Sequence, residues 1–172
     1  KFIHPLDFLK FEDYKKSIFF NSYLKITNQS SIKYENYEID KLLNYYKFLS
    51  NFNFSSFLAN INFFFLKKLN QNEIKIDLII DWYENQILDK GLSLGKNTFY
   101  PKSKLKGHIG FLNDFKSIHY YSPIQLEKKA KALPDELLLI SKKITNTVFN
   151  NSNFITKKIV PAIRNKKLFN VS

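Results

Sequence analysis

The stretch of sequence with the most chemical potential is Asp81 to Gln86, which reads Asp-Trp-Tyr-Glu-Asn-Gln and follows directly on an apolar run. At a strand-to-helix turn, the carboxylate of Glu84 can act as a general base or bind the hydroxyl groups of a ligand. Trp82 can stack on a sugar or a base, and the backbone N–H groups of Asn85 and Gln86 at the helix start can meet an anion. Alternatively, Glu84 only complements the helix dipole from the first turn.

Two further segments carry candidate residues. Gly107 and Gly110 enclose a predicted strand end that bears His108, and residues without a side chain let a backbone approach a ligand closely. His108 can exchange a proton or form hydrogen bonds, although an ordinary turn explains the two glycines equally well. Arg164 follows another predicted strand and is suited to bidentate phosphate binding, with a solvated surface arginine as the alternative.

Several strong motifs are absent from the sequence. It contains no Walker loop, no dinucleotide-binding glycine pattern, no His-Glu-x-x-His and no Gly-x-Ser-x-Gly. No Cys/His spacing and no carboxylate pair with ligand spacing stands out, so the sequence implies no metal site.

The apolar pattern predicts the elements that position these residues. Short β-branched runs predict strands, and apolar residues at helical spacing predict helices. The expected strands are 76–81, 104–109, 136–140 and 157–160, and the expected helices are 38–50, 53–69, 84–94 and 141–150, with a short helical turn at 125–131. Asn53 or Ser55 is expected to cap the second helix and Gly95 to end the third. Residues 17–26 are expected to be strand-like or irregular.

Strands and helices alternate along the second half of the chain. This order predicts an α/β fold with a Rossmann-like parallel sheet flanked by helices. We expect one partial domain, with a mostly helical leading part over 1–71, an α/β part with the motifs over 72–164 and a tail over 165–172. Ligands bind outside the carboxyl ends of such strands, so Glu84, Gly110 and Arg164 are expected at one edge of the sheet.

The composition describes a folded, basic chain of 172 residues. Hydrophobic residues make up 44% of it and aromatic residues 17%, so the chain is not expected to be disordered. It has no cysteine, and its N-terminal segment lacks the apolar region of a signal peptide, so we expect a cytoplasmic protein. The net charge of +12 favours anionic partners, although lysines spread along the whole chain also fit compositional drift. A chain that begins at Lys1 and has no methionine is expected to be a fragment.

Four segments together resemble bacterial surface-carbohydrate (O-antigen or capsule) biosynthesis proteins that look like GT-B glycosyltransferases. Residues 82–95 are similar to a W-[FY]-E-N-Q-x-x-D-K-G-x-x-x-G signature. Residues 107–111, 134–140 and 161–164 are similar to G-Y-Q-G-F, P-D-x-[IL]-x-[VI] and P-A-[FL]-R, in the family's order. The sequence departs from the second pattern at His108 and Ile109, which replace its Tyr-Gln pair.

The resemblance implies an enzyme that transfers a sugar from a nucleotide-activated donor to a surface glycan, with no cofactor. It makes Glu84 the candidate catalytic or acceptor-binding residue. The implied substrate-binding residues are Trp82, Asn85, Gln86, Lys90, Gly107, His108, Gly110 and Arg164. The implied partners are the nucleotide-sugar donor, the glycan acceptor and a further half of the same chain, beyond Ser172, that holds most of the donor site. Peripheral contact with an anionic membrane, at the inner face of the plasma membrane, is also compatible.

Two other classes of function stay open on the sequence. The net charge and the many aromatic residues suit a nucleic-acid-binding module that combines stacking with phosphate contacts. No binding motif supports that class, and the aromatic residues fall mostly on apolar helix faces, so no nucleic acid is expected. The other class is a non-catalytic scaffold that assists glycan assembly at the membrane surface.

Overall fold

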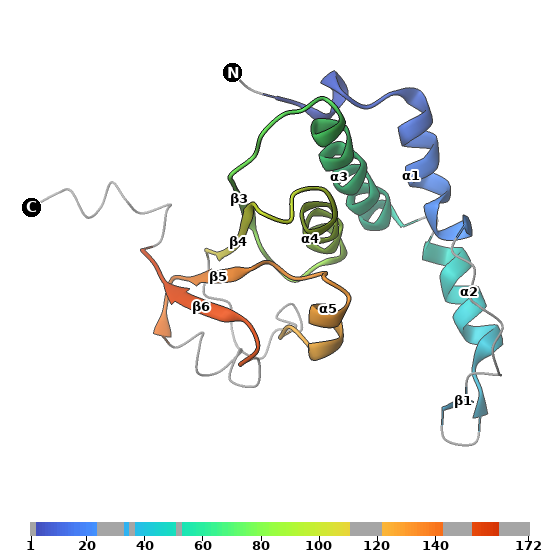
Figure 1. Ribbon diagram of the computed structural model, residues 1–172. Helices are drawn as coiled ribbons and strands as arrows, with labels where there is room; N and C mark the ends of the chain where they lie inside the picture. Colours follow the sequence, from blue (N-terminus) through green and yellow to red (C-terminus); the bar gives the residue numbers. More distant parts are fainter. Residues whose placement is uncertain are drawn as a thin grey trace, which may run out of the picture.

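The computed structural model describes residues 3–23, 33–34, 37–50, 53–110, 122–142 and 153–161. The leading part holds the 3-10 turn η1 (Pro5–Asp7), the helices α1 (Phe11–Tyr23), α2 (Asp40–Ser50) and α3 (Phe54–Gln71), and a hairpin of β1 (Lys33–Tyr34) and β2 (Tyr37–Glu38). The α/β part holds β3 (Leu78–Trp82), α4 (Ile87–Phe99), β4 (Lys104–Ile109), α5 (Gln125–Lys129), β5 (Glu136–Leu139) and β6 (Thr156–Ile159) (Figure 1).

The strands β3, β4, β5 and β6 form one sheet in that order, and every neighbouring pair is parallel. β3 and β5 are short apolar runs, as is typical of parallel strands, whereas β4 and β6 each carry two lysines. The predicted α/β fold with a Rossmann-like parallel sheet is therefore confirmed. The strand expected at 104–109 matches β4, and the other three differ from the observed strands by at most two residues at an end.

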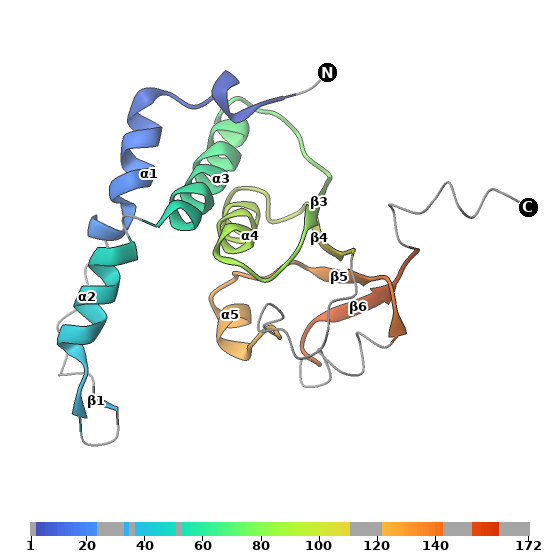
Figure 2. The same cartoon turned by 180° about the vertical axis from the view of Figure 1, so that it is seen from behind.

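The two faces of this sheet differ in what covers them. Ile79, Leu105 and Leu137 point to the face against which α3, α4 and α5 lie, which we call the helix face (Figures 1 and 2). Leu105 and Leu137 are fully buried there. The opposite face, which we call the outer face, carries Leu78 and Ile80, and both are exposed.

Two glycines let α4 pack closely against α3. A Cβ atom at Gly91 would lie 2.0 Å from a backbone carbonyl oxygen of α3, and one at Gly95 would lie 3.2 Å from a Cα atom of α3. Neither glycine has a positive φ angle, so Gly95 continues the helix. The expectation of a helix over 84–94 that ends at Gly95 is therefore wrong, because this glycine serves the helix–helix contact. The helix begins later, at Ile87, and runs to Phe99.

The first helix also differs from the prediction. Residues 17–26 were expected to be strand-like or irregular, which is wrong where they are described, because α1 continues to Tyr23. Ser17 is buried and its hydroxyl donates to the carbonyl oxygen of Asp13 at 2.8 Å, one helical turn back. The side-chain amide of Asn60 on α3 donates to the carbonyl oxygen of Ser17 at 2.9 Å. Contact with α3 thus supports helical structure in a segment whose aromatic residues favour strands.

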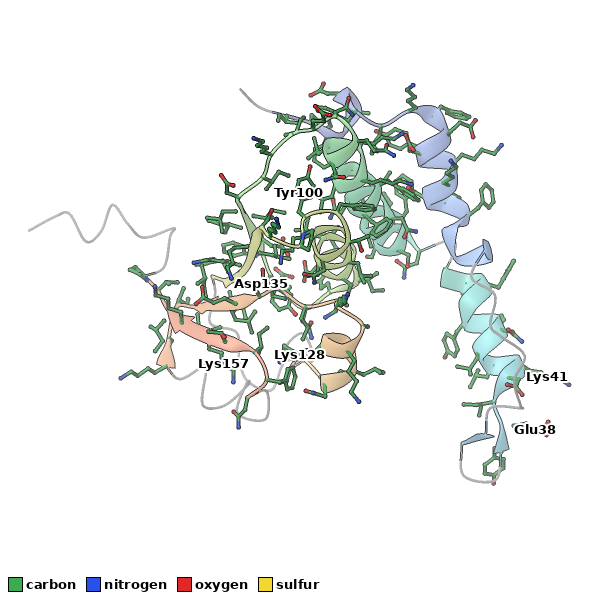
Figure 3. All side chains as sticks on the ribbon, viewed as in Figure 1. Glu38, Lys41, Tyr100, Lys128, Asp135 and Lys157 are labelled. Atoms are coloured by element: carbon green, nitrogen blue, oxygen red, sulfur yellow. The ribbon has the colours of Figure 1, made fainter. Side chains whose placement is uncertain are left out.

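The other two leading helices follow the sequence closely. The side chain of Asn53 accepts the backbone N–H of Ser55 at 2.8 Å, so the predicted cap of α3 is confirmed. The second helix extends away from the sheet, with Lys41 and Glu38 at its far end (Figure 3). No helix within the described residues is long and apolar enough to cross a membrane.

Two expectations fall where the structure gives no description. The helix expected at 141–150 is described only at Ser141 and Lys142. Arg164 lies beyond Pro161, the last described residue, so its expected place at the sheet edge stays a prediction.

Candidate functional site

The carboxyl ends of β3 and β4 lie side by side. The register pairs Trp82 with His108, and the backbone N–H of Tyr83 donates to the carbonyl oxygen of His108 at 3.0 Å. Glu84 and Gly110 follow directly, so both lie at the same edge of the sheet, as the sequence predicted.

The carboxylate of Glu84 is held between two side chains at this edge. Its Oε1 atom accepts a hydrogen bond from the indole Nε1 of Trp82 at 3.1 Å, and its Oε2 atom accepts one from the amide Nε2 of Gln86 at 2.7 Å. Trp82 and Gln86 are exposed, and Glu84 is half-buried. Each carboxylate oxygen keeps a further lone pair for a ligand hydroxyl. We call these three residues the strand-end cluster; it presents a fixed carboxylate beside an accessible indole.

Asp89 of α4 closes the loop that carries this cluster. Its Oδ2 atom accepts the backbone N–H groups of Glu84 at 3.0 Å and of Gln86 at 2.8 Å. Between them, Asn85 has a φ of 57°, a left-handed conformation that asparagine adopts more readily than most residues. Burial raises the pKa of Asp89, and the two N–H groups oppose that rise. The expectation that the N–H of Gln86 is free to meet an anion is therefore wrong.

The ammonium group of Lys90 joins α4 to α5. Its Nζ atom forms an ion pair with Oε1 of Glu127 at 2.9 Å and also contacts Oδ1 of Asn85. The same asparagine oxygen accepts the hydroxyl of Tyr83 at 2.5 Å, and Lys90 Nζ lies 5.8 Å from the centre of the Tyr83 ring. The positive charge of Lys90 is thus balanced within the protein and offers less to a ligand than the sequence alone implies.

Gly107 and Gly110 make room for aromatic rings of this protein. A Cβ atom at Gly107 would lie 2.8 Å from Cβ and Cγ of Tyr83, and one at Gly110 would lie 2.2 Å from Cη2 of Trp82. Close approach of the protein's own side chains explains both glycines, and the approach of a ligand stays a prediction. The approaching groups are Tyr83, which is buried, and Trp82, which borders the site.

His108 lies beneath the indole of Trp82. The two ring centres are 5.4 Å apart at an angle of 49°. The histidine is 1% exposed, and neither of its ring nitrogens has a hydrogen-bond partner in the described part of the chain. Burial lowers the pKa of His108, so the ring is neutral at pH 7. A neutral imidazole here supports the position of Trp82.

Asp81 is the main group that the sequence did not select, although it begins the hexapeptide. Burial raises its pKa to about 7, and the negative charge of Asp89 adds to that rise. Its Oδ2 atom is buried without a hydrogen-bond partner among the described residues. Alternation along β3 turns Asp81 to the helix face and Trp82 to the outer face. The feature of the sequence that could have identified Asp81 is its place, as an acid at the end of an apolar strand.

A cavity of about 640 Å³ opens beside the strand-end cluster. Its lining consists of Ser55, Asn85, Gln86, Ile87, Lys90, Ser122, Ile124 and Glu127. Gln86 belongs to both the cavity and the strand-end cluster, because it lines the cavity and also donates a hydrogen bond to Glu84. The volume is in the range of small-ligand sites. Across the described ranges, no group of three His, Asp or Glu residues is placed to hold a metal ion.

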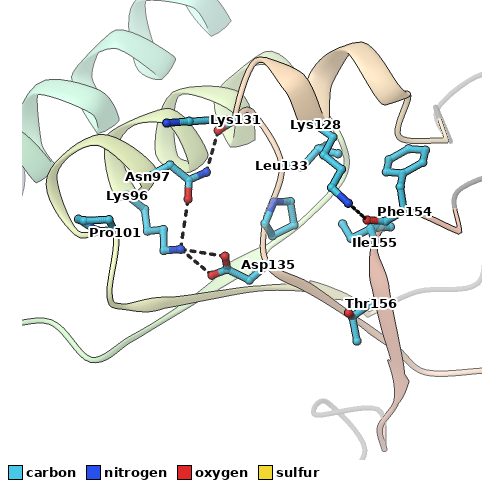
Figure 4. A pocket seen from close by; sticks show the side chains of 11 residues that line it. Lys96, Asn97, Pro101, Lys128, Lys131, Leu133, Asp135, Phe154, Ile155 and Thr156 are labelled. Carbon is cyan, nitrogen blue, oxygen red and sulfur yellow. Dashed lines mark hydrogen bonds and ion pairs between the residues drawn. The ribbon is translucent and has the colours of Figure 1, made fainter.

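A second cavity, of about 490 Å³, lies at the opposite end of the sheet, where β5 and β6 begin (Figure 4). Lys96 of α4 is 2% exposed there, and its Nζ atom contacts the two carboxylate oxygens of Asp135 at 2.7 and 2.9 Å. Oδ2 of Asp135 also accepts the backbone N–H of Leu105 at 2.7 Å. We call these three residues the amino-end junction, because they tie α4 to β4 and to the start of β5.

The fold and the site define an α/β protein with a Rossmann-like parallel sheet and a polar cluster at the carboxyl edge of that sheet. Comparisons with protein-family models, with curated proteins and with solved structures found no match. The resemblance to glycosyltransferases therefore rests on the sequence motifs alone, and a function in sugar transfer is a proposal.

Proposed function

We propose that this chain is part of a glycosyltransferase-like enzyme that transfers a sugar from a nucleotide-activated donor to a glycan acceptor at the strand-end cluster. The observation that carries this proposal is the carboxylate of Glu84, fixed by Trp82 and Gln86 at an exposed sheet edge. A carboxylate accepts the hydroxyl protons of a sugar, and an exposed aromatic ring offers a flat surface to the apolar face of the sugar.

The transfer exchanges one C–O bond for another. The bond between the donor sugar carbon and the nucleotide phosphate breaks, and the phosphate leaves with the bonding electrons. An acceptor hydroxyl oxygen forms the new bond to that carbon and gives up its proton. Glu84 is our candidate to take this proton, because the acceptor hydroxyl can lie within hydrogen-bond reach of it. Burial raises the pKa of Asp81 to about 7, but its side chain points to the helix face, away from Trp82.

The direct test is Glu84→Gln in the full-length natural protein. We expect glycan transfer to fall by about 10²–10⁴-fold, because the substitution keeps the size of the side chain and removes the base. The melting temperature is expected to stay close to that of the wild type. Glu38→Gln, at an exposed residue of β2 far from the strand-end cluster, is the matched control and should transfer normally. Normal transfer by Glu84→Gln would exclude Glu84 as the base, and a strongly lowered melting temperature would give it a structural role in the loop before α4.

Binding can be followed separately on the 172-residue chain. Trp82 is its single tryptophan, so intrinsic fluorescence reports directly on the strand-end cluster. We expect methyl glycosides to change this fluorescence in a saturable way and Glu84→Gln to weaken the effect. Salt-sensitive binding of single-stranded DNA or RNA, with no response to sugars, would instead favour the nucleic-acid-binding class.

A further inference from the structure

The cavity at the amino end of the sheet, which we call the amino-end cavity, is lined by an excess of positive charge. Its volume is about 490 Å³, and its charged lining residues are three lysines and one aspartate, namely Lys96, Lys128, Lys131 and Asp135. Both carboxylate oxygens of Asp135 contact the buried ammonium group of Lys96. The aspartate is therefore neutralised by one lysine, which leaves the positive charges of the other two at the cavity.

Lys128 reaches from α5 to the segment that leads into β6. Its Nζ atom donates to the backbone carbonyl oxygen of Phe154 at 2.5 Å and lies 5.8 Å from the centre of the Phe154 ring (Figure 4). An ammonium group has three N–H donors, and this hydrogen bond uses one of them. None of the ion pairs in the described part of the chain includes Lys128. Its charge is thus held in place without being matched by a carboxylate.

Lys131 occupies a backbone position that favours glycine. Its φ is 58°, and the N–H of Ala132 donates back across it to the carbonyl oxygen of Glu127 at 2.9 Å, as in helix ends closed by a left-handed residue. Glycine adopts this conformation at a lower cost than lysine. The side-chain amide of Asn97 donates to the carbonyl oxygen of Lys131 at 2.8 Å, which fixes the turn against α4. A lysine in place of the favoured glycine, at the lining of a cavity, supports a role for its side chain.

The lining of the amino-end cavity indicates the chemistry of a ligand. Lysine ammonium groups bind phosphate as point charges. A phosphate ion alone would fill only part of the cavity, whose volume lies in the range of sites for small organic ligands. Leu133, Phe154 and Ile155 also line the cavity and give it apolar walls. The cavity therefore suits a phosphate group that is joined to an organic group.

We propose that the amino-end cavity is a second binding site of this protein and that its ligand is a small organic phosphate held by Lys128 and Lys131. Lys96 serves this site indirectly, because it neutralises Asp135, whose free carboxylate would repel the phosphate. The site lies at the opposite end of the sheet from the strand-end cluster. It does not depend on sugar transfer, so its test is independent of the outcome for Glu84.

Calorimetric titration of the 172-residue chain tests this site. The probes are adenosine monophosphate, glucose 1-phosphate and inorganic phosphate, which share the phosphate and differ in what is attached to it. We expect at least one of the two organic phosphates to bind saturably at low salt with a Kd below about 1 mM, more tightly than inorganic phosphate. Added salt should weaken this binding. The tighter of the two organic probes identifies the ligand class as a nucleotide or a sugar phosphate.

Two variants separate binding from folding. We expect Lys128→Gln and Lys131→Gly each to raise the Kd by about 10-fold, because each removes a charged donor to the phosphate. Lys131→Gly should not lower the melting temperature, because glycine favours the left-handed backbone of this turn. The matched control is Lys41→Gln, which removes one positive charge from the exposed surface of α2 and should bind as the wild type does (Figure 3).

Several results would overturn the proposal. One is the absence of saturable binding of both organic phosphates. Equally tight binding of inorganic phosphate, or equal weakening in Lys41→Gln, would reduce the effect to general attraction by the net charge of +12. Binding of a single-stranded oligonucleotide that Lys131→Gly weakens, without binding of either organic phosphate, would assign the two lysines to a nucleic-acid backbone instead.

Discussion

The two ends of the sheet hold their carboxylates in different ways. At the amino-end junction, Asp135 binds the buried ammonium of Lys96 and a backbone N–H, so its charge is matched inside the protein. In the strand-end cluster, Glu84 is held by an indole and an amide, two neutral donors that fix its position, and no lysine within the described ranges forms an ion pair with it. A carboxylate that is placed but not neutralised can still bind a ligand, whereas one that is neutralised mainly ties elements together. The difference supports a stabilising role for the amino-end junction and agrees with our proposal that the strand-end cluster binds a ligand.

One of the two largest expected effects breaks the amino-end junction. Lys96→Ala removes the buried partner of Asp135 and leaves a space beneath α4. We expect it to lower the free energy of unfolding by about 3 kcal/mol, at the lower end for buried pairs because Asp135 is 35% exposed and keeps some water. Urea denaturation measures this. Lys102→Ala, at an exposed lysine of the following turn, should stay within about 0.5 kcal/mol of the wild type. Similar losses in both variants would remove the special role of the junction.

The next effect concerns a buried acid near the strand-end cluster. The folded-state pKa of Asp81, about 7, lies above its ordinary value of 3.8, so the folded protein holds this proton more tightly than the unfolded chain does. Stability from this group is fully present below pH 4 and is lost as the pH rises through 7. Asp81→Asn should therefore be more stable than the wild type at pH 8, by roughly 2–4 kcal/mol, and similar to it at pH 4.

Urea denaturation across pH 4 to 8 measures the contribution of Asp81. Asp77→Asn, at an exposed carboxylate before the same strand, is the control and should keep the wild-type dependence on pH. A loss of stability between pH 4 and 8 that persists unchanged in Asp81→Asn would show that another group causes it.

The smallest expected effect on stability comes from a substitution that disturbs the packing of the Trp82 indole. Gly110→Ala places a Cβ atom 2.2 Å from the present position of Cη2 of Trp82, so the indole must move. Because Trp82 is 37% exposed, the ring has room to shift, and we expect a loss of only about 1 kcal/mol. The fluorescence maximum should shift, and the response to methyl glycosides should weaken.

Gly107→Ala is the matched variant for this packing. Its Cβ atom would meet the buried side chain of Tyr83 at 2.8 Å, where nothing can move freely, so it should destabilise the protein more than Gly110→Ala and affect sugar binding less. If Gly110→Ala destabilised the protein more than Gly107→Ala, Gly110 rather than Gly107 would be the glycine that the packing of the fold requires.

Local signals in the sequence were sufficient for much of the fold. The strand at 76–81 was found because a short β-branched run between polar segments favours a buried strand, and the strand at 104–109 was found although it carries two lysines. The Asn53 cap depends on residues two positions apart, and the shared edge of Glu84 and Gly110 follows from the strand order. The strands and the cap depend on near neighbours, and the shared edge follows from the alternation of strands and helices, so the sequence shows these features directly.

Other features depend on contacts between distant parts of the chain. Gly95 resembles a helix end until α3 lies against it, and the charge of Lys90 looks available until Glu127, far along the chain, pairs with it. Likewise, the apolar run before Asp81 marks the residue, but its pKa of about 7 arises from burial in the folded protein and from the charge of Asp89. The sequence by itself determined the strands, their alternation with helices and the residue types at the strand ends, because these follow from short-range periodicity. Only the tertiary structure decided which charges are neutralised and which stay open, because burial and long-range pairing set the energy of a charge.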